Sequence, residues 1–492
     1  MQNQETSVSM DDTRADRPIS LFRKLLLPVL VIILIGSIWL TLSPDASRQM
    51  KGLGGVLTML SAMGLGVPVA IAMALGGVFG IYALVGMRAV TSALESMPFN
   101  AAANWSYSVL PMFVVMGVIL WRSGVTERIF AAARAWLNWL PGGLAVATNF
   151  AGAGLAAASG STMAISFALG RIAVPEMLKA GYDRGMAAGV VIMAGTLGQL
   201  IPPSILLVIY AGVAQVAVGP LLLAAIVPGL MTAAAYGFMI SARATINPKL
   251  APRSNINIPL RERFNLLKGV WPLPFLVFII IGGLFSGVFT ATEAGAYAAL
   301  ASMLIAFWYS RAKAFPQIGG ALMDTVSAMG SILILIVGVH LLNRFLALSG
   351  LPTLMADWVD GFGLGRVEFL IAVMIFYLIL GMFMDPLAIM LLTIPVFQPT
   401  LAALDISLIW YGIFAVAMGE LAIVSPPVGV LTFLVHKLLN TKEVIGDQKP
   451  IGIGEIFMGL SWFVATQLLV LLILIFYPGI VDWLPNLSSA SG

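Results

Sequence analysis

Apolar runs of membrane length recur from residue 25 to residue 477, and they constrain the fold more than any other feature. A helix needs about 20 apolar residues to cross a bilayer. Of the 492 residues 60% are hydrophobic and only 10% are charged, whereas a soluble domain carries about 25% charged residues. The chain lacks the polar residues to cover a water-facing surface, so we expect a multi-pass protein embedded in the lipid bilayer.

The expected fold is all-α, because helices satisfy their own backbone hydrogen bonds inside lipid. The run 53–86 is too long for one untilted helix, and we divide it at residues 64–68, which hold two glycines and a proline. About eleven crossings result, at 25–43, 53–67, 69–86, 105–121, 184–214, 219–240, 270–288, 293–310, 322–347, 406–438 and 455–477.

Both ends of the chain are polar by comparison. We expect residues 1–24 to form a disordered cytoplasmic N-terminus and 479–492 to form a C-terminal tail. The run 25–43 follows several cations and resembles a signal peptide. Its length and the lack of a clear small-residue cleavage site favour a retained transmembrane helix, with its N-terminus in the cytoplasm.

Two further apolar stretches have polar or proline-broken centres, and each is expected to enter the membrane and return on the same side as a re-entrant hairpin. The first, 142–178, is centred on Ser159-Gly-Ser-Thr162, and the second, 366–400, on Met384-Asp-Pro386. The flanks of the first are rich in Arg and Lys, and those of the second in Asp and Glu. Because cations favour the cytoplasmic side, the two hairpins should open to opposite sides.

The chain divides into two halves, 50–240 and 269–478, around a basic loop at 241–268 that we expect in the cytoplasm. At a shift of 224 residues, Gly195 falls on Gly419, Pro202-Pro203 on Pro426-Pro427, and Ser161 on Asp385. Identities are sparse, but the opposite flanking charge of the hairpins is independent support. Together these features predict an inverted-topology repeat.

Each half thus pairs a polar hairpin tip with a helix that is broken near mid-membrane. Proline removes a backbone donor and frees carbonyl groups, which suit a bare cation, and half-helix N-termini suit an anionic substrate group. The substrate would then meet Pro202, Pro203, Ser204, Pro426 and Pro427. One proline pair could simply kink a packed helix, but two in register favour a binding site.

Charged residues at membrane depth are costly and are candidates for function. Asp385 is the strongest candidate for binding a cation, and a capping role beside Pro386 is the alternative. Glu420 could be a coupling carboxylate or a structural partner for buried backbone, and both interpretations stay open. Arg171 could meet a substrate carboxylate, although its position also suits extension to the interface. Glu293 follows two threonines, and we expect it to cap the helix that begins near 292.

Several function classes lack the residues that they need. There are no cysteines and only two histidines, which argues against thiol chemistry and a His-rich zinc site. The sequence has no phosphate-binding loop for ATP and no hydrolase signature, so we expect no enzyme activity. The net charge of +4 is better explained by membrane topology than by nucleic-acid binding. A secondary transporter is our first expectation, and a passive channel the alternative.

At these same residues the chain resembles the large membrane subunit of the tripartite ATP-independent periplasmic (TRAP) transporters, from about residue 50 to residue 480. The order and spacing of the matching segments carry the resemblance. They are Gly66-Val-Pro-Val-Ala, Leu110-Pro-Met-Phe, Ala158-Ser-Gly-Ser-Thr-Met-Ala164, Gly181-Tyr182, Gly195 through Ser204, Pro228-Gly229, Phe289-Thr-Ala-Thr-Glu-Ala294 and Gly419 through Gly429.

The resemblance implies a sodium-driven, elevator-type importer in the bacterial inner membrane. A periplasmic binding protein would deliver a small organic anion, and a small four-helix membrane subunit would accompany this chain. Coupling to protons is the alternative to sodium. By motif, the implied sodium ligands fall on Ser159, Ser161, Thr162, Gly195, Asp385 and Gly419. The helix 25–43 precedes the usual start of the family.

Overall fold

The computed structural model describes residues 21–252, 258–382, 384–446 and 448–491, and within them every regular element is a helix. Six of these helices are long and apolar enough to cross a membrane, or eight if each of two bent pairs counts as one span. The all-α membrane class is confirmed, and the count of eleven crossings stays a prediction. Most of the expected disordered N-terminus lies outside the described residues; 21–24 belong to the first helix.

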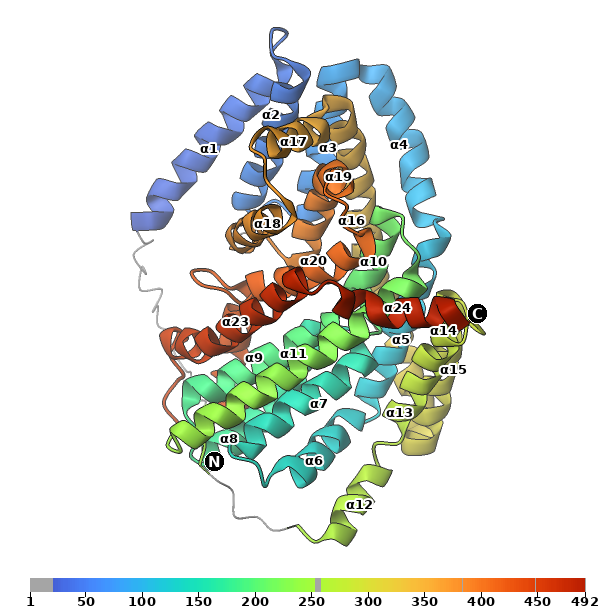
Figure 1. Ribbon diagram of the computed structural model, residues 1–492, viewed down its shortest axis with the longest axis vertical. Coiled ribbons are helices and arrows are strands. Elements are labelled where there is room, and N and C mark those ends of the chain that lie inside the picture. The colour runs from blue at the N-terminus through green and yellow to red at the C-terminus, as the bar shows by residue number, and fades with distance from the viewer. Residues whose placement is uncertain (1–20, 253–257, 383, 447, 492) are drawn as a thin grey trace, which may run out of the picture.

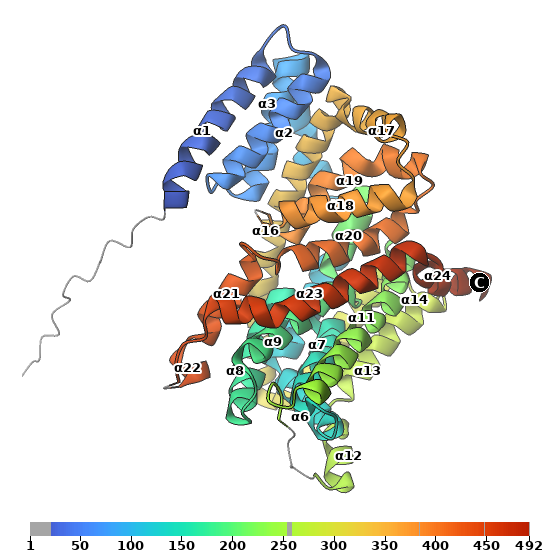
Figure 2. The ribbon, with the colours of Figure 1, turned by 60° about the vertical axis from the view of Figure 1, so that its left-hand side comes forward.

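The N-terminal helices form a bundle at one end of the molecule (Figures 1 and 2). Its members are α1 (Leu21–Leu42), α2 (Arg48–Gly64), α3 (Val69–Val85) and α4 (Met87–Ala102). Helix α1 packs along α2, where the Thr58 hydroxyl donates to Ser37 Oγ at 2.9 Å. Small residues and hydroxyl groups let helices associate closely in lipid. The apolar run 53–86 breaks between α2 and α3 as predicted, but α4 was not expected as an element.

The rest of the first half contains the first hairpin. The helices are α5 (Val109–Arg122), α6 (Val125–Leu137), α7 (Gly143–Ser159), α8 (Thr162–Lys179), α9 (Arg184–Leu200), α10 (Ile205–Ala214) and α11 (Val218–Ile246), with a 3₁₀ turn at Trp105–Tyr107. Helices α7 and α8 pack on each other and on α9, and we call them the first hairpin. Helices α9 and α10 are bent by 41° at a short break, and we call them the first broken helix.

The middle of the chain, residues 260–361, packs beside the helices of the first half and includes one long helix. It consists of α12 (Leu260–Lys268), α13 (Pro272–Val277), a π-helical turn (Phe278–Gly282), α14 (Gly283–Phe285), α15 (Ala291–Ser310), a 3₁₀ turn (Arg311–Lys313), α16 (Ala314–Ser349) and α17 (Leu351–Gly361). Helix α16 packs against α3, α5 and α15. It therefore joins the N-terminal bundle to the helices beside the first hairpin.

The second half ends the chain with a second hairpin, α18 (Arg366–Leu380) and α19 (Pro386–Ala403), and a second broken helix, α20 (Leu408–Ala422) and α21 (Val430–Leu439). They are followed by α22 (Lys442–Ile445), α23 (Ile453–Phe476) and α24 (Gly479–Ser491). Helix α24 occupies the segment expected to be a tail, and it packs on α11. Helix α20 lies against α9, α10 and α11 (Figure 2), so the halves interlock.

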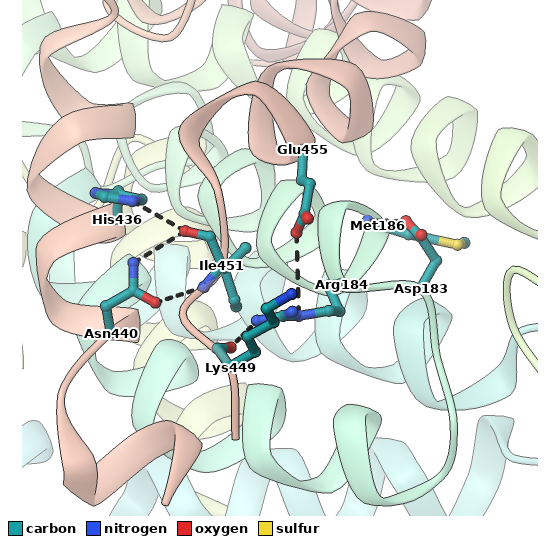
Figure 3. Close-up of polar contacts among 8 residues, drawn as sticks. All are labelled: Asp183, Arg184, Met186, His436, Asn440, Lys449, Ile451 and Glu455. Carbon is teal, nitrogen blue, oxygen red and sulfur yellow. Dashed lines mark hydrogen bonds and ion pairs between the residues drawn. The ribbon is translucent and has the colours of Figure 1, made fainter. Parts of the chain in front are cut away.

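A polar clasp fastens the end of α21 to the start of α9 (Figure 3). His436 Nε2 and Asn440 Nδ2 each lie 3.0 Å from the Ile451 carbonyl oxygen, and Ile451 N–H donates to Asn440 Oδ1 at 2.7 Å. Arg184 donates to the Lys449 carbonyl and lies 4.0 Å from Glu455. The clasp fixes the ends of the two broken helices beside each other.

Candidate functional site

The tip of the first hairpin is a two-residue reversal between α7 and α8. Gly160 has φ of 58°, a conformation that glycine adopts without steric cost. A β-carbon at Gly160 would lie 2.7 Å from the Pro203 carbonyl oxygen, so the tip rests on the first broken helix. Ser161 is extended, and its Oγ accepts from Ala164 N–H at 3.4 Å. Ser161 therefore caps α8, and Thr162 is the first residue of that helix.

The break in the first broken helix, residues 201–204, is buried, and side chains cap the helix that follows it. Ser204 Oγ accepts from Leu207 N–H at 3.2 Å, and Gln199 Oε1 accepts from Leu206 N–H at 3.2 Å. These bonds satisfy two of the free N–H groups at the start of α10. Pro202, Pro203 and Ser204 are all buried. The first proline pair thus lies inside the protein, covered in part by the hairpin tip.

Glycine brings the first hairpin close to its neighbours on two sides. A β-carbon at Gly195 of α9 would lie 2.8 Å from the Thr162 carbonyl oxygen and would meet the Ser166 hydroxyl. On the other side, a β-carbon at Gly117 of α5 would lie 2.9 Å from Ser159 Cα and 3.1 Å from the Ala158 carbonyl oxygen. Backbone therefore lies directly against backbone around this tip.

Two buried hydroxyl oxygens near the tip, Ser159 Oγ and Ser166 Oγ, have no hydrogen-bond partner within the described residues. Leaving a buried polar group unsatisfied costs free energy. Ser159 is one of the predicted ligands, whereas Ser166 was not predicted. Ser166 lies one helical turn after Thr162, a spacing that would have revealed it. Hydroxyl and carbonyl oxygens are the ligands that hard cations prefer, so the first tip fits a small cation.

The second hairpin repeats this geometry with an acidic residue. Asp385 is extended, its Oδ1 accepts from Ala388 N–H at 3.1 Å, and Pro386 starts α19. Asp385 therefore does for α19 what Ser161 does for α8. A β-carbon at Gly419 of α20 would lie 2.9 Å from Pro386 Cβ, as Gly195 faces Thr162 in the first half. These equivalent contacts are 224 positions apart, and the second tip adds a carboxylate.

The second broken helix differs from the first at its break. Seven residues separate α20 from α21, against four between α9 and α10. Thr432 Oγ1 donates to the Val424 carbonyl at 3.2 Å, and Gly429 has φ of 53°. Pro426, Pro427 and Val428 are exposed. The second proline pair therefore lies at the surface of the described chain.

A side-chain hydrogen bond joins the tip of the first hairpin to the second broken helix. Thr162 Oγ1 of the first tip donates to Glu420 Oε2 of the second broken helix at 2.9 Å. Both residues are buried, at 6% and 5% exposure. Gly419, next to Glu420 on α20, faces Pro386, the residue that follows Asp385. Thr162, Asp385 and Glu420 thus belong to one region.

Arg171 lies apart from this region. It is nine residues beyond Thr162 along α8, or about 13 Å at 1.5 Å per residue. Its side chain is exposed, and its Nε lies 4.0 Å from Glu443 Oε2 of α22. The structure therefore pairs Arg171 with a surface carboxylate, away from the hairpin tips.

Two solved structures share the architecture. The YdaH transporter of Alcanivorax borkumensis superposes with a TM-score of 0.59 at 16% identity, covering 80% of this chain and 89% of its own. The Neisseria gonorrhoeae efflux pump MtrF superposes with a TM-score of 0.55 at 14% identity, covering 90% and 98%. These likenesses show that the chain shares the fold of these two proteins.

Sequence relatives are more specific. The C4-dicarboxylate TRAP transporter large permease protein of Pseudomonas aeruginosa is 35% identical over 79% of this chain and 88% of its own length. The protein of the same description from Vibrio cholerae is 32% identical over 88% and 96%. A sialic acid TRAP large permease of V. cholerae is 29% identical over 68% and 78%. All are transporter permeases rather than enzymes. The profile of the tripartite ATP-independent periplasmic transporter DctM component matches residues 56–480, so the chain belongs to that family of TRAP large permease subunits.

Proposed function

We propose that this chain is the permease of a sodium-coupled importer in the bacterial inner membrane. The observation that carries the proposal is the pair of equivalent hairpin tips, Ser161-Thr162 and Asp385-Pro386, each packed against a glycine of a broken helix. Oxygen ligands at two such tips suit sodium, which needs several oxygens in partial replacement of its hydration shell. The Asp385 carboxylate adds the negative charge that would draw a cation to mid-membrane.

The proposed substrate is a small organic anion with one or two carboxylates. Helices α8, α10 and α19 all begin at the site, at Thr162, Ile205 and Pro386. Helix N-termini carry partial positive charge, which favours an anionic group nearby. Two of the relatives described above are named for C4-dicarboxylates, so a four-carbon dicarboxylate is the first substrate to test.

In this proposal the chain works with a small four-helix membrane subunit and a periplasmic binding protein, and its core moves against its frame like an elevator. The core holds the two hairpins and the two broken helices, and the frame holds α2, α3, α5, α15 and α16. The backbone contact of Gly117 with the first hairpin lies between them. That contact supports a moving boundary because no side chain has to be unlocked there.

The test is uptake into proteoliposomes that contain this chain with its small subunit, supplied with binding protein and radiolabelled succinate. Accumulation of succinate above its external concentration should require an inward sodium gradient and should stop when sodium is equal on both sides and the membrane potential is zero. Uptake driven equally well by a proton gradient without sodium would favour proton coupling. Uptake that follows only the succinate gradient, whatever the sodium gradient, would favour a channel and overturn the proposal.

A further inference from the structure

The hydrogen bond between Thr162 and Glu420 crosses from one half of the repeat to the other, over 258 positions of sequence. A carboxylate at 5% exposure is costly unless charge or hydrogen bonds compensate for it. Among the described residues, the Thr162 hydroxyl is the side-chain donor to the Glu420 carboxylate, and the neighbouring Asp385 adds a like charge. A cation near this pair of carboxylates would supply the compensation.

Because Thr162 is the donor in this hydrogen bond, the further interactions of its oxygen are limited. A threonine hydroxyl has one hydrogen and two lone pairs. With the hydrogen donated to Glu420, the Thr162 oxygen can meet any further partner only as an acceptor or as a ligand. A carboxylate that accepts a hydrogen bond from a metal ligand fixes the orientation of that ligand and makes it a better donor of electrons.

The surroundings of Thr162 fit this role. Its carbonyl faces Gly195, where a β-carbon would lie 2.8 Å away, and the unpartnered Ser166 hydroxyl lies beside the same glycine. Two oxygens of α8, the Thr162 carbonyl and the Ser166 hydroxyl, therefore lie next to a position without a side chain. Among the described residues, the titratable groups that interact electrostatically with Glu420 are Asp385 of the second hairpin and Tyr236 of α11, whose hydroxyl donates to Gln467 at 2.8 Å.

We propose that Glu420 is a positioning residue for the cation site of the first hairpin. It holds the Thr162 oxygen as a ligand, and it lends that half-site a negative charge which the first half does not itself provide. The inference rests on the proposed sodium coupling. It goes further because it makes cation binding at the first tip depend on a carboxylate of the second broken helix.

A purely structural link between the halves would have different consequences. Glu420→Gln keeps an oxygen that can accept from Thr162 but removes the charge. Thr162→Ser keeps the hydroxyl, and Thr162→Val removes it at nearly the same volume. A structural link would be satisfied by Gln and Ser alike, whereas the proposed role distinguishes them.

The experiment measures the sodium concentration for half-maximal succinate uptake in the reconstituted system, and sodium-dependent thermal stabilisation of the purified chain. Glu420→Gln should raise the half-saturating sodium concentration roughly 10- to 100-fold, the range for loss of a group that supports a metal ligand. The maximal rate at saturating sodium should be kept. Glu262→Gln, the same change on the exposed helix α12, is the matched control and should leave the sodium dependence unchanged.

The threonine variants make the test independent of how well Glu420→Gln folds. Thr162→Val should raise the half-saturating sodium concentration, and Thr162→Ser should leave it near the wild-type value. In the Thr162→Val, Glu420→Gln double variant this concentration should be no higher than in the more severe single variant. An unchanged sodium dependence in Thr162→Val or Glu420→Gln, beside sodium-driven uptake by the wild type, would overturn this inference alone. Absence of sodium-driven uptake by the wild type would instead overturn the proposed function.

Discussion

The first and second half-sites share one backbone plan and differ in charge and exposure. Ser161 and Asp385 cap equivalent helices, and Gly195 and Gly419 face equivalent tip residues. Yet the first proline pair is buried and the second is exposed, and only the second tip has its own carboxylate. The same backbone plan therefore occurs once with a buried proline pair and a neutral tip, and once with an exposed proline pair and an acidic tip.

The difference in exposure follows from what covers each break. The first break is overlain by the hairpin tip at Gly160 and continues at once into the capped helix α10. The second break is three residues longer, and α21 leaves it toward the polar clasp. The longer second break and the direction of α21 therefore account for the exposure of Pro426 and Pro427.

The largest expected effect on sodium dependence comes from substitutions at the two hairpin tips, which can be compared directly. Asp385→Ala should raise the half-saturating sodium concentration roughly 100-fold or more, because a charged ligand is lost rather than a supporting group. Ser161→Ala should raise it less, since a neutral oxygen contributes less to a cation. Both are measured by succinate uptake at varied sodium, with insertion checked by purified yield. A larger effect from Ser161→Ala would reverse the order of the two half-sites.

The second comparison uses the lack of native cysteine. Val428 and Ser204 are equivalent at the 224-residue shift and differ in exposure, at 37% and 0%. In detergent, Val428→Cys should react with a small maleimide faster than Ser204→Cys by about tenfold or more, because thiol reactivity follows access. The wild-type chain is the blank. Equal labelling rates would remove the asymmetry on which this comparison depends.

A smaller effect is expected from filling the glycine contacts. Gly419→Ala should lower thermal stability by a few degrees, because its β-carbon meets the rigid Pro386 ring and overpacking costs about 1–3 kcal/mol. Gly195→Ala should lower it at least as much, because its β-carbon would lie 2.8 Å from the Thr162 backbone carbonyl oxygen, which cannot rotate away as the Ser166 hydroxyl can. Gly319→Ala on α16, where the β-carbon meets nothing within 4 Å, is the control. The ranking is read from melting curves of the purified variants.

The smallest effect should come from Arg171→Gln. Its ion pair with Glu443 is exposed and 4.0 Å long, and such pairs contribute less than about 1 kcal/mol. Uptake and its sodium dependence should stay at wild-type values. A clear rise in the succinate concentration for half-maximal uptake would instead return Arg171 to the substrate site.

The local chemistry of the site could be predicted from the sequence, because caps and breaks depend on neighbouring residues. The extended Ser161 and Asp385, and the cap formed by Glu293 with Thr290 at the start of α15, follow from residues at most three positions away. The equivalence of the two tips followed from the 224-residue shift. The caps and the equivalence of the tips therefore depend only on the order and spacing of residues along the chain.

The remaining features depend on packing between distant segments. Nothing near Arg171 indicates that α22 will bring Glu443 beside it, and nothing near Glu420 selects Thr162 as its partner. The two Pro-Pro motifs are identical in type, so their burial could not be distinguished by pattern. Helix α4 contains Glu95 and Pro98 and lacks an apolar run of membrane length, so hydropathy does not indicate a helix there.

The contact of Gly117 with the first hairpin has an entropic consequence. Side chains that lock together lose rotamer freedom each time they engage and regain it each time they separate. A glycine facing a backbone has no rotamers to lose. If the hairpin slides past α5 during transport, this contact can form and break in every cycle at almost constant conformational entropy. The position of the core would then be set by the binding of cation and substrate.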